Sequence, residues 1–428
     1  MAQNSVVAEG EEMNTLLSEY LNIMSGNGSE DENPDKPDTT GPSISLQTSS
    51  TENTITVIVT ATDESGLADS ETYTYFIDNV QQGVSTTENT KEYTGLQPST
   101  EYTIKVMVKD KLGNAAEKEE KVSTTEPEIP DMGDAKPTEG QDGPKFENTT
   151  TIQDDSGNSV VIPGGFHLDA ESGTKVEEGI VIEDDNGNQF VWIPTGTYQT
   201  STGLKTNNLA RRTFTSSGAT EVSGDGVIEG SYYGEGDSRS VASTQIAAFK
   251  ASASPKSETN PNGKGGFYIG RYEQGTGNVC KYNQTPYVNV TRDTAKSQAE
   301  AMYSGKNNNV VSELISSYAW DTALNFICQT NSAGYILATT TSRDYGNFYP
   351  GSRQNTGTYS ADNYSNIHDL LGNCFEWTTE YSNYSGNNGP CVTRGGIFGS
   401  LTYAAQRYLG DMNYTSDILS FRLQLYVK

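Results

Sequence analysis

The sequence predicts an all-β module followed by a larger α+β module, with a helix in front of both. Residues 54–60 and 102–108 alternate apolar and polar side chains, as half-buried strands do. Residues 291–302 and 310–328 carry helix formers or apolar residues at helical spacing. Stretches rich in acidic residues and proline precede and follow the all-β module, and 428 residues are enough for two or three domains.

The net charge of −28 argues against functions that require binding to phosphate groups. Binding to phosphate requires clustered Lys and Arg, so the charge argues against a nucleic-acid groove and against adhesion to anionic lipid. No apolar run reaches the roughly 20 residues that a membrane helix needs, and no signal peptide is visible. Such acidity is typical of a well-hydrated protein, and we expect an extracellular, cell-surface or virion-associated location.

Residues 1–24 are expected to form an amphipathic helix. Its apolar residues recur at spacings of three, four and seven: Val6, Val7, Met13, Leu16, Leu17, Tyr20, Leu21 and Met24. Residues 25–42 hold no apolar side chain and are expected to be a flexible linker. A helix isolated in this way is expected to dock on a carrier protein; the alternative is that it frays in solution.

Residues 43–126 are expected to form a β-sandwich. The run Leu96-Gln-Pro-Ser-Thr-Glu-Tyr102 resembles the L-x-P-x-T-x-Y motif of fibronectin type III domains, in which the tyrosine hydroxyl caps a turn. Asp110-Lys-Leu-Gly-Asn114 is then the hairpin turn between the last two strands. No pocket is expected here, so a spacer role is favoured over adhesion.

Residues 127–145 are expected to be a second linker, acidic and rich in proline. A repeat follows: Asp154-Asp-Ser-Gly-Asn158 and Asp184-Asp-Asn-Gly-Asn188 each precede a strand-like run, which predicts β-hairpins over the region 146–180 and at the start of a domain over 181–428. Each turn offers oxygen ligands of the kind that Ca²⁺ prefers, but the spacing differs from that of an EF-hand, and a plain turn is favoured. Residues 200–265 are expected to form long loops.

A series of short motifs runs through the last domain, covering more than half of the chain: Phe190-Val-Trp-Ile-Pro194, Gly266-Phe-Tyr-Ile-Gly-Arg-Tyr-Glu273, Pro286-Tyr-Val-Asn-Val290, Asp369-Leu-Leu-Gly-Asn-Cys-Phe-Glu-Trp377, Arg394-Gly-Gly396, Arg407 and Phe421-Arg422. This order resembles that of the formylglycine-generating enzymes, or sulfatase-modifying factors. The resemblance implies a decorated C-type lectin fold, with two helices packed on a twisted antiparallel sheet. It also implies that Trp320-Asp321 anchors the second helix to the sheet.

The motif residues are interpreted as scaffold. A buried arginine needs a carboxylate partner, because an unpaired buried charge costs several kcal/mol, roughly 3–5. Paired glycines allow close backbone approach or a positive φ. The expected structural residues, called the anchor residues below, are Asn373, Glu376, Trp377, Arg394, Gly395, Gly396, Arg407, Phe421 and Arg422.

The resemblance also implies an oxidase activity, which the residues disfavour. In that family a pair of cysteines after the R-G-G motif binds copper, whereas residues 395–407 contain no cysteine or histidine. The chain has only two histidines, His167 and His368, so nucleophilic catalysis has few residues to use. We therefore expect no enzymatic activity, no catalytic residue and no cofactor.

The segment between Arg394 and Phe421 has the composition of a binding surface. Tyrosine provides rigid contact area, while Ser, Asn and Asp provide adaptable hydrogen bonds. The arrangement resembles the variable proteins of diversity-generating retroelements, which present hypervariable residues between fixed anchors; the alternative is an ordinary polar loop. The expected ligand-binding residues, called the display residues below, are Ile397, Phe398, Ser400, Tyr403, Asp411, Asn413, Tyr414 and Asp417.

Cysteine chemistry stays open at this level. Cys374 and Cys391 bracket one strand-to-strand excursion, and either a disulfide or two buried thiols fits them. Taken together, the sequence predicts a non-enzymatic display protein that binds a protein or glycan on a cell surface. The alternatives are a sulfatase-modifying homologue without its catalytic cysteines, and a structural decoration protein of a virion or pilus.

Overall fold

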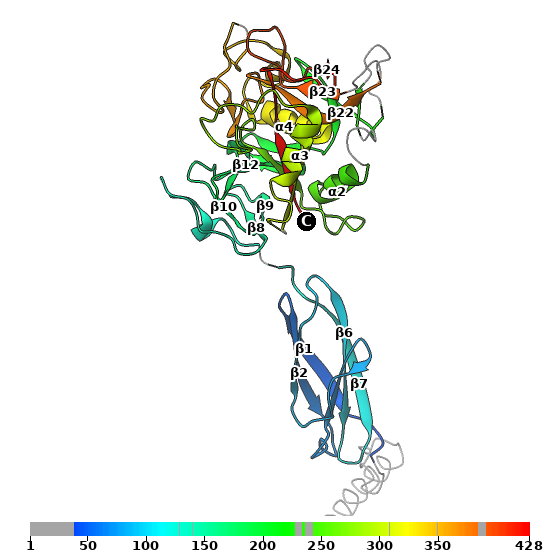
Figure 1. Ribbon diagram of the computed structural model, residues 1–428. Coiled ribbons are helices and arrows are strands. Elements are labelled where there is room, and N and C mark those ends of the chain that lie inside the picture. The colour runs from blue at the N-terminus through cyan, green and yellow to red at the C-terminus, as the bar shows by residue number, and fades with distance from the viewer. Residues whose placement is uncertain are drawn as a thin grey trace, which may run out of the picture. The chain divides into compact units, whose positions relative to one another are not determined.

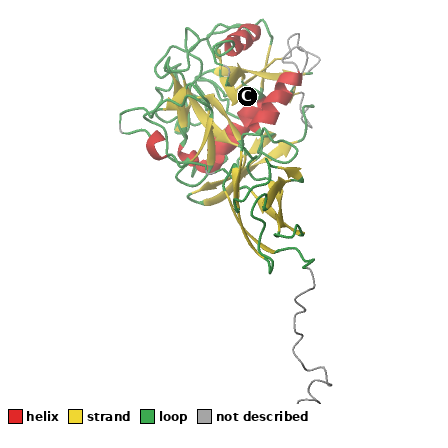
Figure 2. Cartoon of the chain, turned by 90° about the horizontal axis from the view of Figure 1, so that it is seen from below, coloured by secondary structure: helices red, strands yellow, loops and turns green. Residues whose placement is uncertain are grey.

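The computed structural model describes residues 38–127, 129–138, 140–226, 233–235, 243–307, 309–348, 350–383 and 391–428. They form two compact units that meet in sequence at Glu128 and Ile129. Both units are built mostly from strands and loops, and helices are few (Figures 1 and 2). The expected N-terminal helix and most of the expected linker 25–42 lie outside the described residues. No helix among the described residues is long and apolar enough to cross a membrane.

The first unit is a two-sheet β-structure with the strands β1 (Ser43–Ser50), β2 (Thr54–Thr62), β3 (Tyr73–Ile77), β4 (Val80–Gln81), β5 (Thr90–Thr94), β6 (Glu101–Lys109) and β7 (Ala115–Ser123). One sheet has the order β1-β2-β5 and the other β4-β3-β6-β7. The alternation in β2 and β6 buries every second residue, including Val57 and Val106, in one apolar core between the sheets.

Two local predictions in this unit are confirmed. The hydroxyl of Tyr102 accepts a hydrogen bond of 2.9 Å from the backbone N–H of Gln97. The segment Asp110–Asn114 turns β6 into β7, and its aspartate carboxylate accepts hydrogen bonds from the backbone N–H groups of Leu112 and Asn114. Aspartate at the first turn position therefore supplies the acceptor that closes the hairpin.

The second prediction of a linker, over 127–145, needs correction. Residues 129–146 pack on the second unit, and Met132 is buried in its core. The segment runs beside β10 (Phe166–Leu168), where Gly143 and Phe146 donate backbone hydrogen bonds to Leu168 and Phe166. These ladder bonds and the buried methionine hold a proline-rich segment that composition alone assigns to a linker.

Both repeat copies form β-hairpins. The first joins β8 (Thr150–Gln153) to β9 (Ser159–Ile162), and the second joins β11 (Val181–Asp184) to β12 (Gln189–Pro194). In each turn the first aspartate accepts from two backbone N–H groups and from an asparagine side chain, at Asp154–Asn158 and at Asp184–Asn188. Both oxygens of each carboxylate thus accept hydrogen bonds within the turn itself.

A six-stranded sheet forms the centre of the second unit, in the order β10-β11-β12-β18-β26-β19. β18 (Gly266–Gly270) and β26 (Leu423–Val427) are its inner strands, and each residue of both is buried. The expected strand over 190–194 is therefore found in β12, and the motif that begins at Gly266 provides β18. The five residues before the C-terminal lysine thus form an inner strand, and β10 and β19 are the edges of the sheet.

A second sheet carries the C-terminal motifs. It contains β17 (Tyr233–Gly234), β22 (Phe375–Ser382), β23 (Cys391–Arg394), β24 (Tyr408–Gly410) and β25 (Leu419–Phe421). β22 pairs with β23 in antiparallel orientation and with β25 in parallel orientation. This pairing places the G-N-x-x-E-W run directly between the R-G-G and F-R motifs.

The helices connect these sheets. α3 (Arg292–Ala301) begins after Thr291, whose side chain accepts from the N–H of Thr294, which confirms the expected first helix. α4 (Ser317–Thr330) contacts β12 of one sheet and β22 of the other, and it lies between them in Figure 1. α2 (Ser243–Ala253) packs on β18 and β26, and α5 (Ile336–Thr339) follows α4.

Two expectations about this unit are wrong in part. Residues 310–314 form β19, paired with β26, and the helix begins only after the capping residue Ser316. The β-branched pair at positions 310 and 311 favours a pleated sheet surface over a helix. The region 200–265 also holds more than loops: β13 (Gly196–Thr200) with β14 (Gly203–Asn207), β15 (Arg211–Thr215) with β16 (Gly218–Val222), and α2.

Short elements complete the unit: the 3₁₀ turns η1 (Gly133–Ala135) and η2 (Val176–Glu178), and the small strands β20 (Asn363–Tyr364) and β21 (Ile367–His368).

Candidate functional site

Two arginines enclose the loop 395–406. Arg394 binds Asp321 at 2.5 Å and Glu380 at 3.0 Å, while Arg407 binds the other oxygens of the same carboxylates at 2.7 and 2.5 Å. Asp321 comes from α4 and Glu380 from β22, and both are fully buried. Burial raises the pKa of Asp321, but Arg394 and Arg407 hold that pKa below its usual value. Arg211 is also fully buried and lies 3.7 Å from Glu380, so three arginines share the two carboxylates. The four side chains of Arg394, Arg407, Asp321 and Glu380 are called the arginine clamp below.

The glycines that follow Arg394 have the expected conformation. Gly395 and Gly396 have φ values of 98° and 77°. A Cβ atom at Gly395 would come within 3.2 Å of the Trp320 ring, and one at Gly396 within 2.7 Å of Phe348. Trp320 also lies 5.7 Å from the Arg394 guanidinium and donates to the carbonyl of Ala404. Only glycine fits here, because the chain must turn against an aromatic wall.

A second buried ion pair holds the end of the chain. Arg422 donates three hydrogen bonds to Glu376, at 2.8, 3.0 and 3.2 Å, and two more to the carbonyl oxygens of Gly270 and His368. Neither Glu376 nor Arg422 has any exposed surface. Register places Glu376 opposite Arg394 in the backbone ladder, yet the carboxylate turns to Arg422 instead. The pair thereby ties β22 to the sheet that contains β18.

Asn373 and Trp377 complete the scaffold between the two pairs. Asn373 has a φ of 63° and donates to Glu273 at 3.0 Å, while its carbonyl oxygen accepts from Asn347 and from the backbone of Gln354. The Trp377 indole donates to the carbonyl of Val290 at 3.0 Å and is buried. Each anchor residue is thus buried, except that the side chain of Arg407 keeps 8% exposure.

The display residues lie in a different environment. Asn413, Tyr414 and Asp417 are exposed, and the other five are half-buried: Ile397, Phe398, Ser400, Tyr403 and Asp411. Ile397 and Tyr403 pack against the main core, so these two contribute to the fold as well. The structure therefore separates anchor from display residues by burial, with Ile397 and Tyr403 on the boundary.

An apolar pocket of about 210 Å³ lies where the loops 395–406 and 411–418 meet the second sheet. Its walls include Phe375 and Trp377 of β22 and Tyr408 of β24, and three display residues line it: Ile397, Ser400 and Tyr414. Tyr408 stacks on Phe375 with ring centroids 5.2 Å apart, and it remains 53% exposed. A cavity of this size takes an apolar side chain or one face of a sugar ring, with polar groups at its rim.

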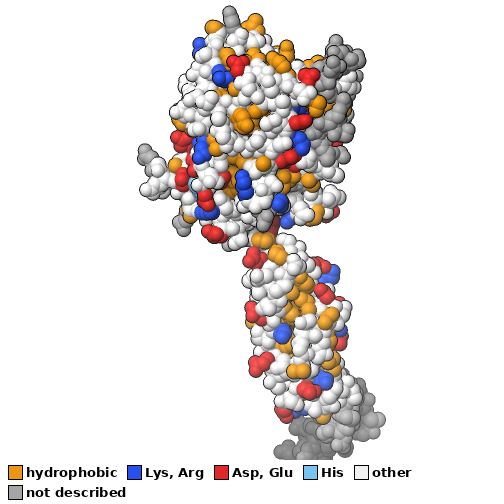
Figure 3. Space-filling model, viewed as in Figure 1, with side chains coloured by type: hydrophobic (Ala, Val, Ile, Leu, Met, Phe, Trp, Pro, Cys, Tyr) orange, Lys and Arg blue, Asp and Glu red, His pale blue; other side chains and the backbone are white. Residues whose placement is uncertain are grey.

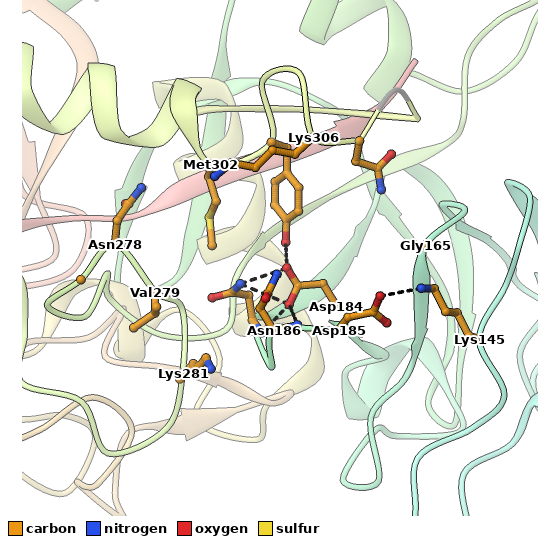
Figure 4. A pocket seen from close by; sticks show the side chains of 14 residues that line it. Lys145, Gly165, Asp184, Asp185, Asn186, Asn278, Val279, Lys281, Met302 and Lys306 are labelled. Atoms are coloured by element: carbon orange, nitrogen blue, oxygen red, sulfur yellow. Dashed lines mark hydrogen bonds and ion pairs between the residues drawn. The ribbon is translucent and has the colours of Figure 1, made fainter.

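A larger polar pocket, of about 640 Å³, lies elsewhere on the same unit. Figure 4 shows Lys145 joined to Asp185 on one side, with Met302 and Lys306 opposite Asp184. The Asp184 carboxylate accepts from the Tyr303 hydroxyl at 2.7 Å in addition to its turn donors. None of the display residues lines this pocket.

The cysteines are free and buried. Of the two alternatives for Cys374 and Cys391, the structure contains thiols. Burial raises the pKa of Cys280 to about 11 and that of Cys328 to about 12, and it raises the pKa of Cys374 well above its usual value. Thiols in such surroundings resist ionisation, and the thiolate is the form that attacks or binds soft metals.

More buried carboxyl groups lie around Arg422 than its single positive charge can balance. Burial, with Asp369 and Glu376 nearby, raises the pKa of Glu273 well above its usual value, and burial also raises the pKa of Asp362 and brings that of Asp369 to about 7. Neither oxygen of Asp362 has a hydrogen-bond partner among the described residues. Burial and two arginines lower the pKa of His368 to about 3, so this imidazole is neutral.

The surface provides no basic groove on the face shown in Figure 3, where acidic and basic side chains are interspersed among uncharged ones.

Sequence reasoning missed part of the candidate site. Tyr408 and Leu401 are 53% and 73% exposed beside the display residues, although the sequence prediction does not include them. The wall residues Phe375 and Ile418 lie more than 40 positions apart in the sequence, so only the fold brings them together at the pocket.

Comparisons with known proteins identify no family. No family model matches the chain, and no curated protein matches it significantly. Parts of it match solved structures: one titled "Myokine structure" (15% identity, TM-score 0.17, 21% of this chain and 99% of that one) and the central fibronectin-III array of RIM-binding protein (15%, 0.16, 37% and 45%). A third is SGBP-B of the Bacteroides ovatus mixed-linkage glucan utilization locus, in complex with a mixed-linkage heptasaccharide (16%, 0.15, 33% and 40%). The chain spans less than half the length of the last two, and scores this low support no conclusion about fold or function.

Proposed function

We propose that this protein is a non-enzymatic display protein whose second unit binds a protein or glycan ligand on a cell surface. The unit is proposed to be a C-type lectin-like head of the formylglycine-generating-enzyme type. The ordered motifs between Phe190 and Arg422, and helices packed against two sheets, support that proposal. The first unit is proposed to be a fibronectin type III-like spacer, supported by its strand order and by the Tyr102 hydrogen bond.

The observation that carries the proposal is the division between anchors and loops. The arginine clamp holds both ends of the loop 395–406, while the Arg422–Glu376 pair follows the loop 411–418. Side chains in these loops can change without touching either ion cluster, because the clusters use none of the display residues. A surface that tolerates substitution on a rigid base is what a diversified binding protein requires.

Chemistry at the apolar pocket fits recognition. Tyr408 and Tyr414 stand half-exposed at a cavity with an aromatic floor, and Ser400 and Thr402 provide hydroxyl groups beside it. Aromatic anchors with small polar neighbours form the usual centre of a binding surface. We infer an extracellular, cell-surface or virion-associated role, in which residues 1–24 attach the protein to a carrier.

The direct test is binding of the labelled full-length protein to a glycan array and to intact cells from several bacterial and host sources. Saturable binding to a defined glycan or cell type, lost in a Tyr408→Ala, Tyr414→Ala variant of unchanged melting temperature, is the expected result. Binding that survives this variant contradicts the proposed surface. Sequencing of the gene from many isolates gives a second test, because diversification predicts substitutions concentrated at the display residues.

The competing function is the oxidase reaction of the resembled family. The segment 395–407 lacks cysteine, and three of the four buried thiols, Cys280, Cys328 and Cys374, have raised pKa values that disfavour the thiolate needed to bind copper. Incubation with copper and a peptide containing C-x-P-x-R is expected to produce no formylglycine. Formation of the aldehyde would overturn the non-enzymatic assignment.

A further inference from the structure

Three potential metal ligands converge where residues 129–146 meet the six-stranded sheet. His167 lies on β10, Glu183 on the neighbouring β11, and Asp142 on the segment that runs beside β10. The Nε2 atom of His167 is 3.3 Å from Asp142 Oδ2 and 3.9 Å from Glu183 Oε1, and the three atoms all lie within 4.8 Å of one another. They come from three chain segments that the fold, not the local sequence, brings together.

The His167 contact is not a hydrogen bond. Its Nε2 atom is buried and has no hydrogen-bond partner among the described residues, although a carboxylate oxygen lies 3.3 Å away. Two ligands that each lie about 2.1 Å from one tetrahedral ion are roughly 3.4 Å apart. The observed spacing therefore matches donors that share a cation, with a small movement of Glu183 to close the third side.

Each carboxylate is held in place by the oxygen that does not face His167. Asp142 Oδ1 accepts from the N–H of Ala170 at 2.9 Å. Glu183 Oε2 accepts from the Gln189 amide at 2.6 Å, and Arg271 in turn donates to the Gln189 carbonyl oxygen at 3.0 Å. Such outer partners orient metal ligands in proteins, and here the other oxygen of each carboxylate lies toward the imidazole.

We propose that Asp142, His167 and Glu183 bind a divalent transition-metal ion of the Zn²⁺ type. Two carboxylates neutralise the charge of such an ion, and the imidazole selects it over Ca²⁺ and Mg²⁺, which prefer oxygen. Three protein ligands leave a fourth position for water. The bound ion fastens residues 129–146 to the strand pair β10–β11. It stabilises the second unit and stands apart from the proposed ligand surface.

The test uses the full-length protein, freed of metal by chelation and titrated with Zn²⁺, Mn²⁺ and Ca²⁺ separately by calorimetry and by thermal melting. One saturable Zn²⁺ site with a rise in melting temperature is expected. His167→Ala and Asp142→Asn are each expected to weaken Zn²⁺ binding by more than tenfold and to abolish the rise. Asp185→Asn is the matched control. It removes the 2.6 Å ion pair between Asp185 and Lys145, a residue of the segment 129–146, and leaves the three proposed ligands in place.

Limited proteolysis of the wild-type protein gives a readout that needs no variant. Zn²⁺ is expected to slow cleavage within residues 129–146, and chelator is expected to restore it. The proposal is overturned if the wild type shows no saturable Zn²⁺ binding, if His167→Ala retains it, or if cleavage is unaffected by metal. An equal response to Ca²⁺ overturns it as well, since Ca²⁺ gains little from an imidazole ligand.

Discussion

Arg394 and Arg407 bind the same two carboxylates through different oxygen atoms, so the two ends of the loop 395–406 are held by one buried cluster. The loop between them carries half of the display residues, and none of its display side chains takes part in the cluster. This relationship explains how one scaffold can support many loop sequences, and it makes the two kinds of residue separable by experiment.

Arg394→Ala should destabilise the second unit. The substitution leaves Asp321 with only the Arg407 guanidinium, and Glu380 with Arg407 and the more distant Arg211, at 3.7 Å. Breaking such a buried cluster costs about 3–5 kcal/mol of unfolding free energy. Chemical denaturation measures the loss. Arg343→Ala is the control, because Arg343 is exposed and contacts Tyr359 at the surface, so its removal should cost less than about 0.5 kcal/mol. Equal effects of the two substitutions would contradict the clamp.

Glu376→Ala should be as severe, since it leaves the Arg422 guanidinium buried without its carboxylate and costs about 3–5 kcal/mol. Glu221→Ala offers a comparison at a partly exposed pair, where Glu221 faces Arg212 at 3.1 Å and is 48% exposed. That pair should contribute about 1 kcal/mol or less. If both variants melt alike, Glu376 is not a scaffold residue.

Replacement of the exposed display residues should spare the fold. A triple Ala variant at Asn413, Tyr414 and Asp417 should change the unfolding free energy by about 0.5 kcal/mol or less, while loss of the Tyr414 contact costs about 2 kcal/mol of binding. Ile397→Ala and Tyr403→Ala should instead lower the melting temperature, because both side chains pack on the core. A triple variant that precipitates would place these loops in the core.

Stability should fall as pH rises from 5 to 8. Glu273, Asp362 and Asp369 have raised pKa values in the folded state, so the stability they contribute is complete below about pH 4 and is lost as pH rises through the folded pKa, about 7 for Asp369. For Asp369 alone the loss is roughly 2–3 kcal/mol between pH 5 and pH 8. Asp321 acts in the opposite sense, but only as pH falls below about 4.

Asp369→Asn should flatten this profile, as melting temperatures recorded across the pH range will measure. Asn tolerates the positive φ of 60° at this position and can still accept from Gly357. Asp155→Asn is the control, because the Asp155 carboxylate is exposed and its pKa is lowered, mainly by the hydrogen bond from Lys136. The contribution of Asp155 to stability therefore changes only at pH values below the usual pKa of an aspartate. An unchanged slope in Asp369→Asn would show that this group ionises normally.

Tyr102→Phe should destabilise only the first unit. It removes the acceptor of the Gln97 N–H, and one such hydrogen bond contributes about 0.5–1.5 kcal/mol. Calorimetry should show the transition of the first unit shifted to lower temperature, with that of the second unit unchanged. A shift in both transitions would mean that the units unfold together.

The sequence by itself determined the local structure. Period-two runs predicted β2 and β6, the Asp–Gly–Asn turns predicted their hairpins, and the threonine cap predicted the start of α3, because each depends on neighbours in the chain. The need of Arg394 and Arg422 for buried carboxylates was also predictable, since the cost of an unpaired charge is general. The identity of the partners was not.

Only the tertiary structure decided those partners. Glu376 faces Arg394 in the strand ladder but binds Arg422, while Arg394 binds Asp321, a residue of a distant helix. The same holds for β19, where pairing with the C-terminal strand outweighs helical spacing, and for residues 129–146, which the buried Met132 holds on the core. Long-range burial and pairing energies set these outcomes, and no local pattern encodes them.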